Sequence, residues 1–526
     1  MQKYTVKGLN FEVDFEVLKC SASILSGRFG EISVLKSHLF SAILKNTSTK
    51  EYKEITSLSN FECVSVSDDE ENISFVFENP DGLSCLLFRI TAYKSEKFLE
   101  WTVEVINEND NWSVMSISYH TPLLSADYFD LFIPVNCGRV IKNAGNIGYY
   151  RNSDKENFFY MSYFAVYGKT DGVYIGIEDP KSSIRRYSVE AKESKATIGA
   201  EFYGIDGTKA ANSFSVNGKC KWQYFSGDWY DATEIYKEFV YAKAEWLPTV
   251  DSDGRPDTPE KFKEIPVWVY DYLPNSEYQR DNRPKTLSPT LVKKSQDHWY
   301  KSAIELKKAL GLPLAYHVYN WHHIPFNIEY PHFWPPKPEF NEGAKELRKN
   351  GIYVFPYINA LSWEENDFEG GHEMTFENTG CYEAVTDEEG NNRTTVYPQT
   401  TISGNPSRLA RICPTSEKWH GIIENLTRKM EKELEIDGIY YDQVSATSGR
   451  PCYNEKHSHA LGGGSYWTDG FNKMMKKINR KKPKDSFYFS ECNAEGYMKS
   501  FDGFLTWVWA SADEVPAFPS VYAGKG

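Results

Sequence analysis

The second half of the chain alternates short apolar runs with amphipathic helical segments, and few folds accommodate that pattern. The runs are apolar on both faces and rich in β-branched and aromatic residues, which is typical of parallel strands covered by helices. More than five such units in succession favour an eight-stranded β/α barrel over an open sheet. We therefore predict a (β/α)8-type TIM barrel over residues 265–526.

The predicted barrel contains seven recognisable strands, at residues 266–272, 312–321, 351–359, 437–443, 486–491, 501–509 and 516–524. Between them, apolar residues recur at helical spacing from Trp299 to Leu310, from Trp419 to Met430 and from Phe471 to Ile478. Because a closed barrel of this type has eight strands, we expect its C-terminal end to be missing from this chain. The segment 363–412, rich in Gly, Asn, Thr and Glu, predicts an active-site loop after the third strand.

Residues 1–228 show a different pattern, in which apolar and polar residues alternate between short turn signals. Runs such as NISFVFEN, FLEWTVEVIN and GVYIGIED predict an N-terminal antiparallel β-sandwich. Asp231-Ala-Thr-Glu234 resembles a capping box and indicates the start of a helix. That helix and the polar stretch TVDSDGRPDTPEKFKE form a predicted linker over residues 229–264.

The charge balance limits the partners of the protein. There are 59 Lys and Arg residues against 73 Asp and Glu, a net charge of −14, which argues against nucleic acid or an anionic membrane as a partner. No apolar run reaches the roughly 18 residues of a membrane helix, and the N-terminus lacks the apolar stretch of a signal peptide. The nine cysteines include no C-x-x-C pair. We expect a reduced, cytoplasmic protein, while noting that an exported protein trimmed of its signal would look the same.

Polar residues that end the predicted barrel strands are the candidates for an active site, because barrel active sites lie at the carboxyl ends of the strands. Those ends supply Asp271, Asn320, Asn359, Asp442 and Glu491. Two of these residues are carboxylates on successive strands. A carboxylate at the end of a buried strand is costly to desolvate unless it is paired, hydrogen-bonded or functional. The alternative is a structural carboxylate that caps a helix or pairs with an arginine.

Two carboxylates on neighbouring strands suit glycoside hydrolysis, which needs one group to attack the anomeric carbon and one to protonate the leaving oxygen. Neighbouring strands lie about 4.8 Å apart, so the two side chains can reach the separation of about 5–5.5 Å found in retaining enzymes. We predict Asp442 as the nucleophile and Glu491 as the acid/base, its pKa raised by burial and by the neighbouring charge. Glu495, four residues on, is a rival for the acid/base role.

Histidines and cysteines near the same strand ends could be metal ligands, or they could bind sugar or pack in the core. His457-Ser-His459, before Gly462-Gly-Gly464, has the spacing of two metal ligands, but the sequence indicates no third ligand. We therefore expect these two histidines, like His322, to bind sugar hydroxyls, and we predict neither a metal nor a cofactor. Three cysteines near strand ends are expected to be small buried residues: Cys413, Cys452 and Cys492.

Tryptophans near the strand ends are candidate stacking platforms for a sugar ring, although packing in the core is the alternative for each. Trp321 and Trp363 follow their strands into loops, while Trp507 and Trp509 point the same way from one strand. With Gln443, which follows the predicted nucleophile, Trp321, Trp363 and Trp507 complete the predicted substrate-binding set.

Three stretches carry a resemblance to known proteins: CPTSEKWHGIIENLTRKMEKELEIDGIYYDQVSA (413–446), KHSHALGGGSYW (456–467) and FYFSECNAEGYMKSFDGFLTW (487–507). They resemble an uncharacterised bacterial family of glycosidase-like barrels with an N-terminal β-sandwich. The DGIYYDQ segment is also similar to the nucleophile strand of endo-α-N-acetylgalactosaminidases and, more distantly, to the α-galactosidase clan. The resemblance implies a retaining α-glycosidase, with Asp442 matching the nucleophile and Glu491 the acid/base.

The sequence thus predicts a glycoside hydrolase, acting on an α-linkage in an oligosaccharide or glycan. Two alternatives remain open. One is a carbohydrate-binding protein with a decayed catalytic site. The other is a metal-dependent barrel hydrolase in which the paired histidines and Asp442 are ligands.

Overall fold

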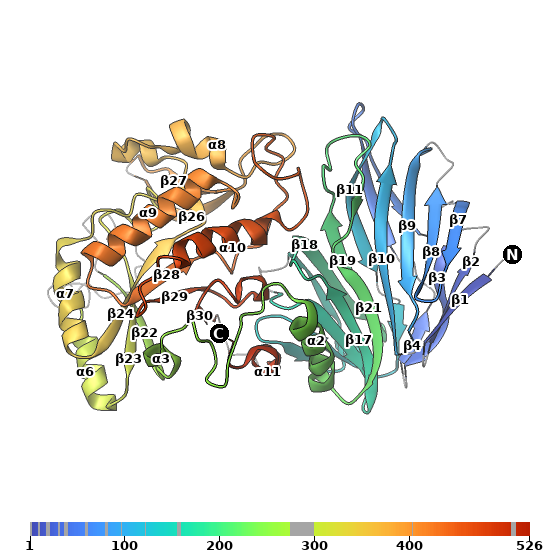
Figure 1. The fold of residues 1–526 in the computed structure, drawn as a ribbon, viewed down its shortest axis with the longest axis horizontal. Helices are drawn as coiled ribbons and strands as arrows, with labels where there is room; N and C mark the ends of the chain where they lie inside the picture. Colours follow the sequence, from blue (N-terminus) through green and yellow to red (C-terminus); the bar gives the residue numbers. More distant parts are fainter. Residues whose placement is uncertain are drawn as a thin grey trace.

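The computed structural model describes residues 3–8, 11–16, 21–29, 32–35, 40–57, 62–78, 83–95, 97–120, 123–154, 159–273, 299–401, 403–506 and 512–525. Two antiparallel sheets form the N-terminal part of the molecule, and a parallel sheet with helices forms the C-terminal part (Figure 1). No helix among the described residues is long and apolar enough to cross a membrane.

Among the described residues the first antiparallel sheet has eleven strands, in the order β1-β2-β3-β4-β12-β19-β11-β5-β6, with β18 also on β19 and β15 on β18. Its strands are β1 (Lys3–Gly8), β2 (Phe11–Glu16), β3 (Ser21–Phe29), β4 (Ile32–Leu35), β5 (Phe40–Asn46), β6 (Tyr52–Thr56), β11 (Trp112–His120), β12 (Leu123–Ser125), β15 (Tyr149–Asp154), β18 (Arg185–Lys192) and β19 (Lys195–Tyr203).

The second antiparallel sheet has ten strands in the part of the chain that the structure describes, in the order β14-β13-β16-β17-β21-β10-β9-β8-β7, with β20 also on β10. Its strands are β7 (Glu62–Asp68), β8 (Asn72–Glu78), β9 (Leu86–Tyr93), β10 (Phe98–Asn107), β13 (Asp130–Ile133), β14 (Arg139–Ile141), β16 (Tyr163–Tyr167), β17 (Asp171–Glu178), β20 (Phe214–Ser215) and β21 (Lys219–Ser226). The predicted N-terminal antiparallel β-structure is confirmed.

Burial explains the alternating sequence pattern of these sheets. Along β8 and β9, buried and partly exposed residues alternate, because one face of each strand packs on the other sheet and the opposite face is partly open to water. Trp101 of β10 and Trp222 of β21 lie in this core, with their ring centroids 4.4 Å apart in an edge-to-face contact.

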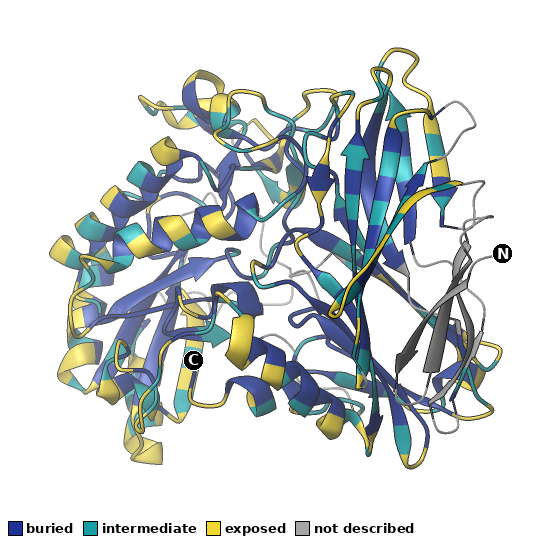
Figure 2. Cartoon of the chain, turned by 45° about the vertical axis from the view of Figure 1, so that its right-hand side comes forward, coloured by how far each residue is buried: buried dark blue, intermediate teal, exposed yellow. Residues whose placement is uncertain are grey.

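The parallel sheet has six strands among the described residues, in the order β22-β23-β24-β28-β29-β30. They are β22 (Val267–Tyr272), β23 (Leu314–Tyr319), β24 (Ile352–Asn359), β28 (Gly438–Asp442), β29 (Phe487–Glu491) and β30 (Gly503–Leu505). Each lies within one of the ranges predicted from the sequence. Every residue of β28 is buried, as expected for a strand covered on both faces, and Figure 2 shows the parallel strands mostly in dark blue.

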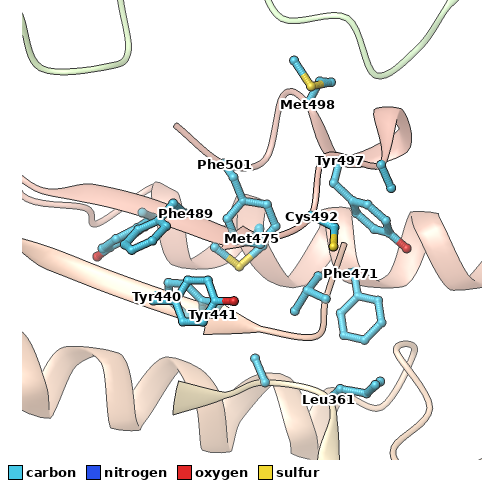
Figure 3. Packing of buried hydrophobic residues seen from close by; sticks show 14 of the residues in the cluster. Leu361, Tyr440, Tyr441, Phe471, Met475, Phe489, Cys492, Tyr497, Met498 and Phe501 are labelled. Atoms are coloured by element: carbon cyan, nitrogen blue, oxygen red, sulfur yellow. The ribbon is translucent and has the colours of Figure 1, made fainter. Parts of the chain in front are cut away.

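Most helices lie outside the parallel sheet or between the two parts of the molecule (Figure 1), and α1 packs on the N-terminal sheets. They are α1 (Ala144–Ile147), α2 (Trp229–Lys243), α3 (Glu260–Lys263), α6 (Lys301–Leu310), α7 (Pro338–Lys349), α8 (Cys381–Glu383), α9 (Glu417–Glu433), α10 (Tyr466–Asn479) and α11 (Ala517–Tyr522), with the short turns η1 (Asp367–Gly370), η2 (Phe376–Gly380) and η3 (Glu495–Tyr497). Figure 3 shows Phe471 and Met475 of α10 among the buried side chains around β28 and β29.

Three expectations about elements need correction. Residues 516–524 were predicted as a strand but contain helix α11, which buries Ala517, Phe518, Val521 and Tyr522 at helical spacing. The N-cap of helix α2 is Asp228, three residues before the predicted N-cap Asp231, which is instead the N3 residue that completes the box. The segment 363–412 is not a plain loop, because it contains the small sheet β25 (Ser362–Glu364), β27 (Pro406–Arg411) and β26 (Thr394–Thr400).

Candidate active site

The register of the parallel sheet places the two predicted catalytic carboxylates side by side. Asn359 of β24 pairs with Asp442 of β28. Tyr441 pairs with Ser490, so the next position along each strand brings Asp442 next to Glu491 of β29. Because side chains alternate along a strand, both carboxylates lie on the same face as Tyr440 and Phe489, whose ring centroids are 4.9 Å apart.

Asp442 is buried and is held by two phenols. The hydroxyl of Tyr357 donates to its Oδ2 atom and the hydroxyl of Tyr440 donates to its Oδ1 atom, each at 3.2 Å. Hydroxyl donors favour the ionised form of a carboxylate, so they lower the pKa of Asp442. These contacts fix the orientation of the carboxylate at the end of β28.

Burial, and after it the neighbouring Glu491 carboxyl, raise the pKa of Asp442 well above its usual range. The same two side chains are within hydrogen-bonding reach of each other. Two ionised carboxylates this close repel each other, which favours a state in which one of the two groups keeps its proton. The arrangement therefore supplies one acid and one base at a single point.

Aromatic residues that the sequence analysis did not select surround the pair. Tyr272 and Tyr319 stack with ring centroids 4.7 Å apart, and Tyr319 lies 4.9 Å from Tyr357 by the same measure. The hydroxyl of Tyr330 donates to that of Tyr357 at 3.3 Å. A usable signal was present in the sequence, because Tyr357 and Tyr440 lie two positions before Asn359 and Asp442 and so share their faces.

The backbone turns sharply just after three of the strand ends. Asn320, Gln443 and Cys492 have φ values of 55°, 66° and 56°, in the left-handed region that residues other than glycine seldom adopt. Such strain clusters at functional sites. At Gln443 the turn directs the side-chain amide to the hydroxyl of Tyr397 at 2.8 Å, and the hydroxyl of Ser362 donates to its carbonyl oxygen at 3.3 Å.

Asn359 lies beside Asp442, at the end of the neighbouring strand β24. Its Oδ1 atom accepts from the backbone N–H groups of Leu361 and Ser362, at 3.0 and 2.8 Å. Its buried amide nitrogen has no hydrogen-bond partner in the part of the chain that the structure describes. A ligand hydroxyl would be a suitable acceptor for this amide, and the substrate-binding role of Asn359 stays a prediction.

Three predicted substrate-binding residues are fully buried in the structure: Trp321, His322 and Trp363. The indole N–H of Trp321 donates to the carbonyl oxygen of Tyr357 at 2.5 Å, and that of Trp363 donates to Asp367 at 2.6 Å. His322 Nδ1 donates to the carbonyl oxygen of Ile324 at 2.8 Å. This burial favours a packing role over direct contact with a sugar, because no face of these rings is open to solvent.

Two carboxylates predicted near the site face elsewhere. Asp271 is exposed on the face of β22 opposite Tyr272, beside Tyr316. Glu495 in η3 is buried, and it accepts from the hydroxyls of Ser162, Tyr236 and Tyr522 at 2.8, 2.6 and 3.0 Å. These partners belong to the β-sandwich and to helices α2 and α11.

The remaining predicted positions do not join the carboxylate pair. His457 and His459 lie with Cys413 and Cys452, in a cluster described below. Trp507, together with Trp509, lies outside the described residues.

Glu364 of β25 is a further buried carboxyl, which the sequence analysis did not select. Its Oε1 atom accepts from the Asn366 amide at 3.1 Å, and its Oε2 atom has no partner among the described residues. Burial raises the pKa of Glu364 to about 7.

A comparison with protein families places the sequence in one of them. The family described as "Domain of unknown function (DUF6259)" matches residues 214–525, more than half of the chain. The chain belongs to this DUF6259 family. The predicted resemblance to an uncharacterised glycosidase-like family is therefore confirmed.

Two curated relatives extend the comparison. The chain is 24% identical over 376 residues to "Putative glycoside hydrolase 22789" of Monosiga brevicollis, across 67% of this chain and 30% of that protein. It is 28% identical over 223 residues to "Putative glycoside hydrolase" of Bacteroides thetaiotaomicron, across 41% of this chain and 31% of that protein. The DUF6259 chain thus spans about a third of the length of these relatives.

Solved structures share the fold. The α-N-acetylgalactosaminidase NagBb of Bifidobacterium bifidum, in complex with GalNAc, superposes with a TM-score of 0.74 at 13% identity, over 99% of this chain and 83% of that chain. A GH36 α-galactosidase, AgaA of Geobacillus stearothermophilus, superposes with a TM-score of 0.50 at 9% identity, over 100% of this chain and 77% of that chain. At these identities the likeness concerns the fold alone.

Proposed function

We propose that the DUF6259 chain is a retaining α-glycosidase in which Asp442 is the nucleophile and Glu491 is the acid/base. The observation that carries this proposal is the contact of two carboxyls at the ends of adjacent parallel strands, on the inner face of the sheet. The curated relatives, named as glycoside hydrolases, support the reaction class.

In the first step Asp442 attacks the anomeric carbon while Glu491 gives its proton to the glycosidic oxygen, so the aglycone leaves as an alcohol. In the second step Glu491 takes a proton from water, whose oxygen displaces Asp442 and releases the sugar. Retention is favoured because the two carboxylates end neighbouring strands, which lie about 4.8 Å apart, whereas inverting enzymes hold a water between groups about 6.5–9.5 Å apart.

The anomer and the sugar are inferred from the neighbours in fold. Both named structures are enzymes for α-linked galacto-configured sugars, according to their titles. An α-galactoside or α-N-acetylgalactosaminide is therefore the first substrate class to test. Asn359, Gln443 and the phenols around Asp442 supply polar groups for the sugar hydroxyls.

The alternatives receive less support. A decayed binding protein would not need two carboxylates held in contact by register and by two phenols. For a metal-dependent hydrolase, the paired histidines should lie with Asp442, but their nitrogen atoms lie with two cysteine thiols instead.

The test is sugar release from a panel of α- and β-linked aryl glycosides by the chain and by the Asp442→Asn variant. We expect turnover of one α-linked class and a loss of at least about 10³-fold in the variant, which keeps the shape of the side chain but cannot attack. Undiminished turnover by a folded Asp442→Asn protein would refute the assignment. Turnover of β-linked substrates alone would refute the proposed anomer.

A further inference from the structure

Two cysteines and two histidines from distant parts of the sequence meet at one point beside helix α10. Cys413 follows strand β27, whereas Cys452, His457 and His459 belong to the segment between β28 and α10. One ligand-type atom from each of the four residues lies within 4.8 Å of every other. Both cysteines are fully buried and both histidines are partly buried.

The imidazoles are oriented with one nitrogen turned to the cysteines. His457 Nε2 donates to the carbonyl oxygen of Tyr382 at 3.1 Å, so in the neutral ring the lone pair is on Nδ1, which lies 3.4 Å from Cys452 Sγ. His459 Nδ1 donates to the carbonyl oxygen of Ala460 at 2.8 Å. The His459 Nε2 atom is buried and has no hydrogen-bond partner among the described residues. Histidines that bind metals are held in this way, with the second nitrogen bonded to a carbonyl.

We propose that Cys413, Cys452, His457 and His459 bind a structural zinc ion. Zinc favours four-coordinate tetrahedral sites with two thiolates and two imidazoles, at about 2.3 Å to sulfur and 2.0–2.1 Å to nitrogen. Those lengths require sulfur and nitrogen atoms about 3.5 Å apart, close to the separation of Cys452 Sγ and His457 Nδ1. Four protein ligands leave no open position for a substrate, so the site holds structure and does not perform catalysis.

The zinc ion would anchor the segment that follows the β28 strand. The backbone N–H of Gly462 donates to the Cys452 carbonyl oxygen at 2.8 Å, and that of Gly463 donates to the Gly204 carbonyl oxygen in the sandwich at 2.9 Å. A Cβ atom on Gly463 would lie 1.9 Å from the Tyr203 carbonyl oxygen, so only glycine fits there. The zinc ligands and this close approach together tie the segment to β27 and to the sandwich.

The test measures metal content in the protein purified without chelators or a metal-affinity tag. We expect about one zinc ion per chain by mass spectrometry of the metals, and visible absorption bands of tetrahedral thiolate-bound Co²⁺ after exchange. Removal of zinc by 1,10-phenanthroline should lower the melting temperature by several degrees, and added zinc should restore it.

Variants locate the site. Cys452→Ala and His459→Gln should each retain less than a tenth of the zinc, while Cys220→Ala, which removes a buried cysteine of the sandwich, should retain all of it. If Cys452→Ala does not fold, the zinc content of His459→Gln, which changes a partly buried side chain, still tests the proposal. The cobalt spectrum of the unaltered chain tests it as well. Wild-type protein that takes up no zinc, or that carries a Cys413–Cys452 disulfide by peptide mass mapping, would overturn the proposal.

Discussion

At the scale of single residues, two groups of neighbours shift the pKa of Asp442 in opposite directions. Burial and the Glu491 carboxyl raise its pKa, and the hydroxyls of Tyr440 and Tyr357 lower it. A nucleophile must be ionised to attack, so the phenols extend the activity toward lower pH in the proposed mechanism. Their contribution can be measured separately from that of the carboxyl pair.

Tyr357→Phe removes one of the two donors to Asp442 and leaves the ring in place. Because the pKa of Asp442 should then rise, the acidic limb of kcat/KM against pH should move to higher pH. At the optimum we expect a loss of about tenfold, the value of a hydrogen bond to a charged group. The measurement is the pH profile on the best substrate of the panel.

Tyr441→Phe is the matched control for this variant. Tyr441 lies on the same strand as Asp442 but shares a 2.9 Å hydrogen bond with Thr427 of α9, on the outer face of the sheet. The Tyr441→Phe variant should therefore leave the acidic limb of the kcat/KM profile at the wild-type pH. Equal shifts in both variants would contradict the role given to Tyr357.

At the scale of elements, the small sheet of β25, β27 and β26 closes over the carboxyl ends of the parallel strands through Ser362, Gln443 and Tyr397. It also buries Glu364, whose pKa is raised to about 7 from an ordinary value of 4.5. A raised folded-state pKa of an acid means that the native state binds more protons than the unfolded state. Stability therefore falls as pH rises from about 4.5 to about 7.

Glu364→Gln should remove this dependence, since the amide carbonyl can still accept from Asn366. The free energy of unfolding of the variant should exceed that of the wild type by up to about 3 kcal/mol at pH 8 and match it near pH 4.5. Urea unfolding at a series of pH values measures the difference. Parallel stability curves for the two proteins would show that Glu364 does not titrate in this window.

Element positions were largely predictable, because strands buried on both faces and amphipathic helices leave strong periodic signals. The helix within 516–524 was not predictable, because Pro516 and Pro519 interrupt a short apolar run that is compatible with either a strand or a helix. Asp442 and Glu491 could be chosen as candidates because the active site of a β/α barrel lies at the carboxyl ends of its strands. The grouping of Cys413 with Cys452 and His457 depends on tertiary packing, which one sequence does not encode locally.

At the scale of the whole molecule, a buried polar network joins the sandwich to the C-terminal part. Arg185 and Asp179 form an ion pair at 2.8 Å, both fully buried. Arg185 also donates to the hydroxyl of Ser162 at 2.6 Å, and that hydroxyl donates to Glu495. Glu495 thus acts at the junction of the two parts, and this placement argues against it as the acid/base.

Glu495→Gln should lower the free energy of unfolding by about 2 kcal/mol, because hydroxyl donors then face an amide nitrogen in place of a carboxylate oxygen. Its kcat per folded molecule should stay within about twofold of the wild type. Glu491→Gln should do the opposite, with a large loss of kcat and little change in stability. Thermal unfolding and active-site-normalised kinetics on both variants separate the two residues. A larger loss of kcat in Glu495→Gln would reverse the assignment.

The central claim, that Asp442 attacks and Glu491 protonates, is tested most directly by azide rescue on an activated aryl α-glycoside, with products identified by proton NMR. Azide should replace the missing carboxylate of Asp442→Ala and attack from the opposite face, which gives the β-glycosyl azide. In Glu491→Ala it should attack the covalent intermediate on Asp442 and give the α-glycosyl azide. The same azide anomer from both variants, or a β-configured first product from the wild type, would contradict the account.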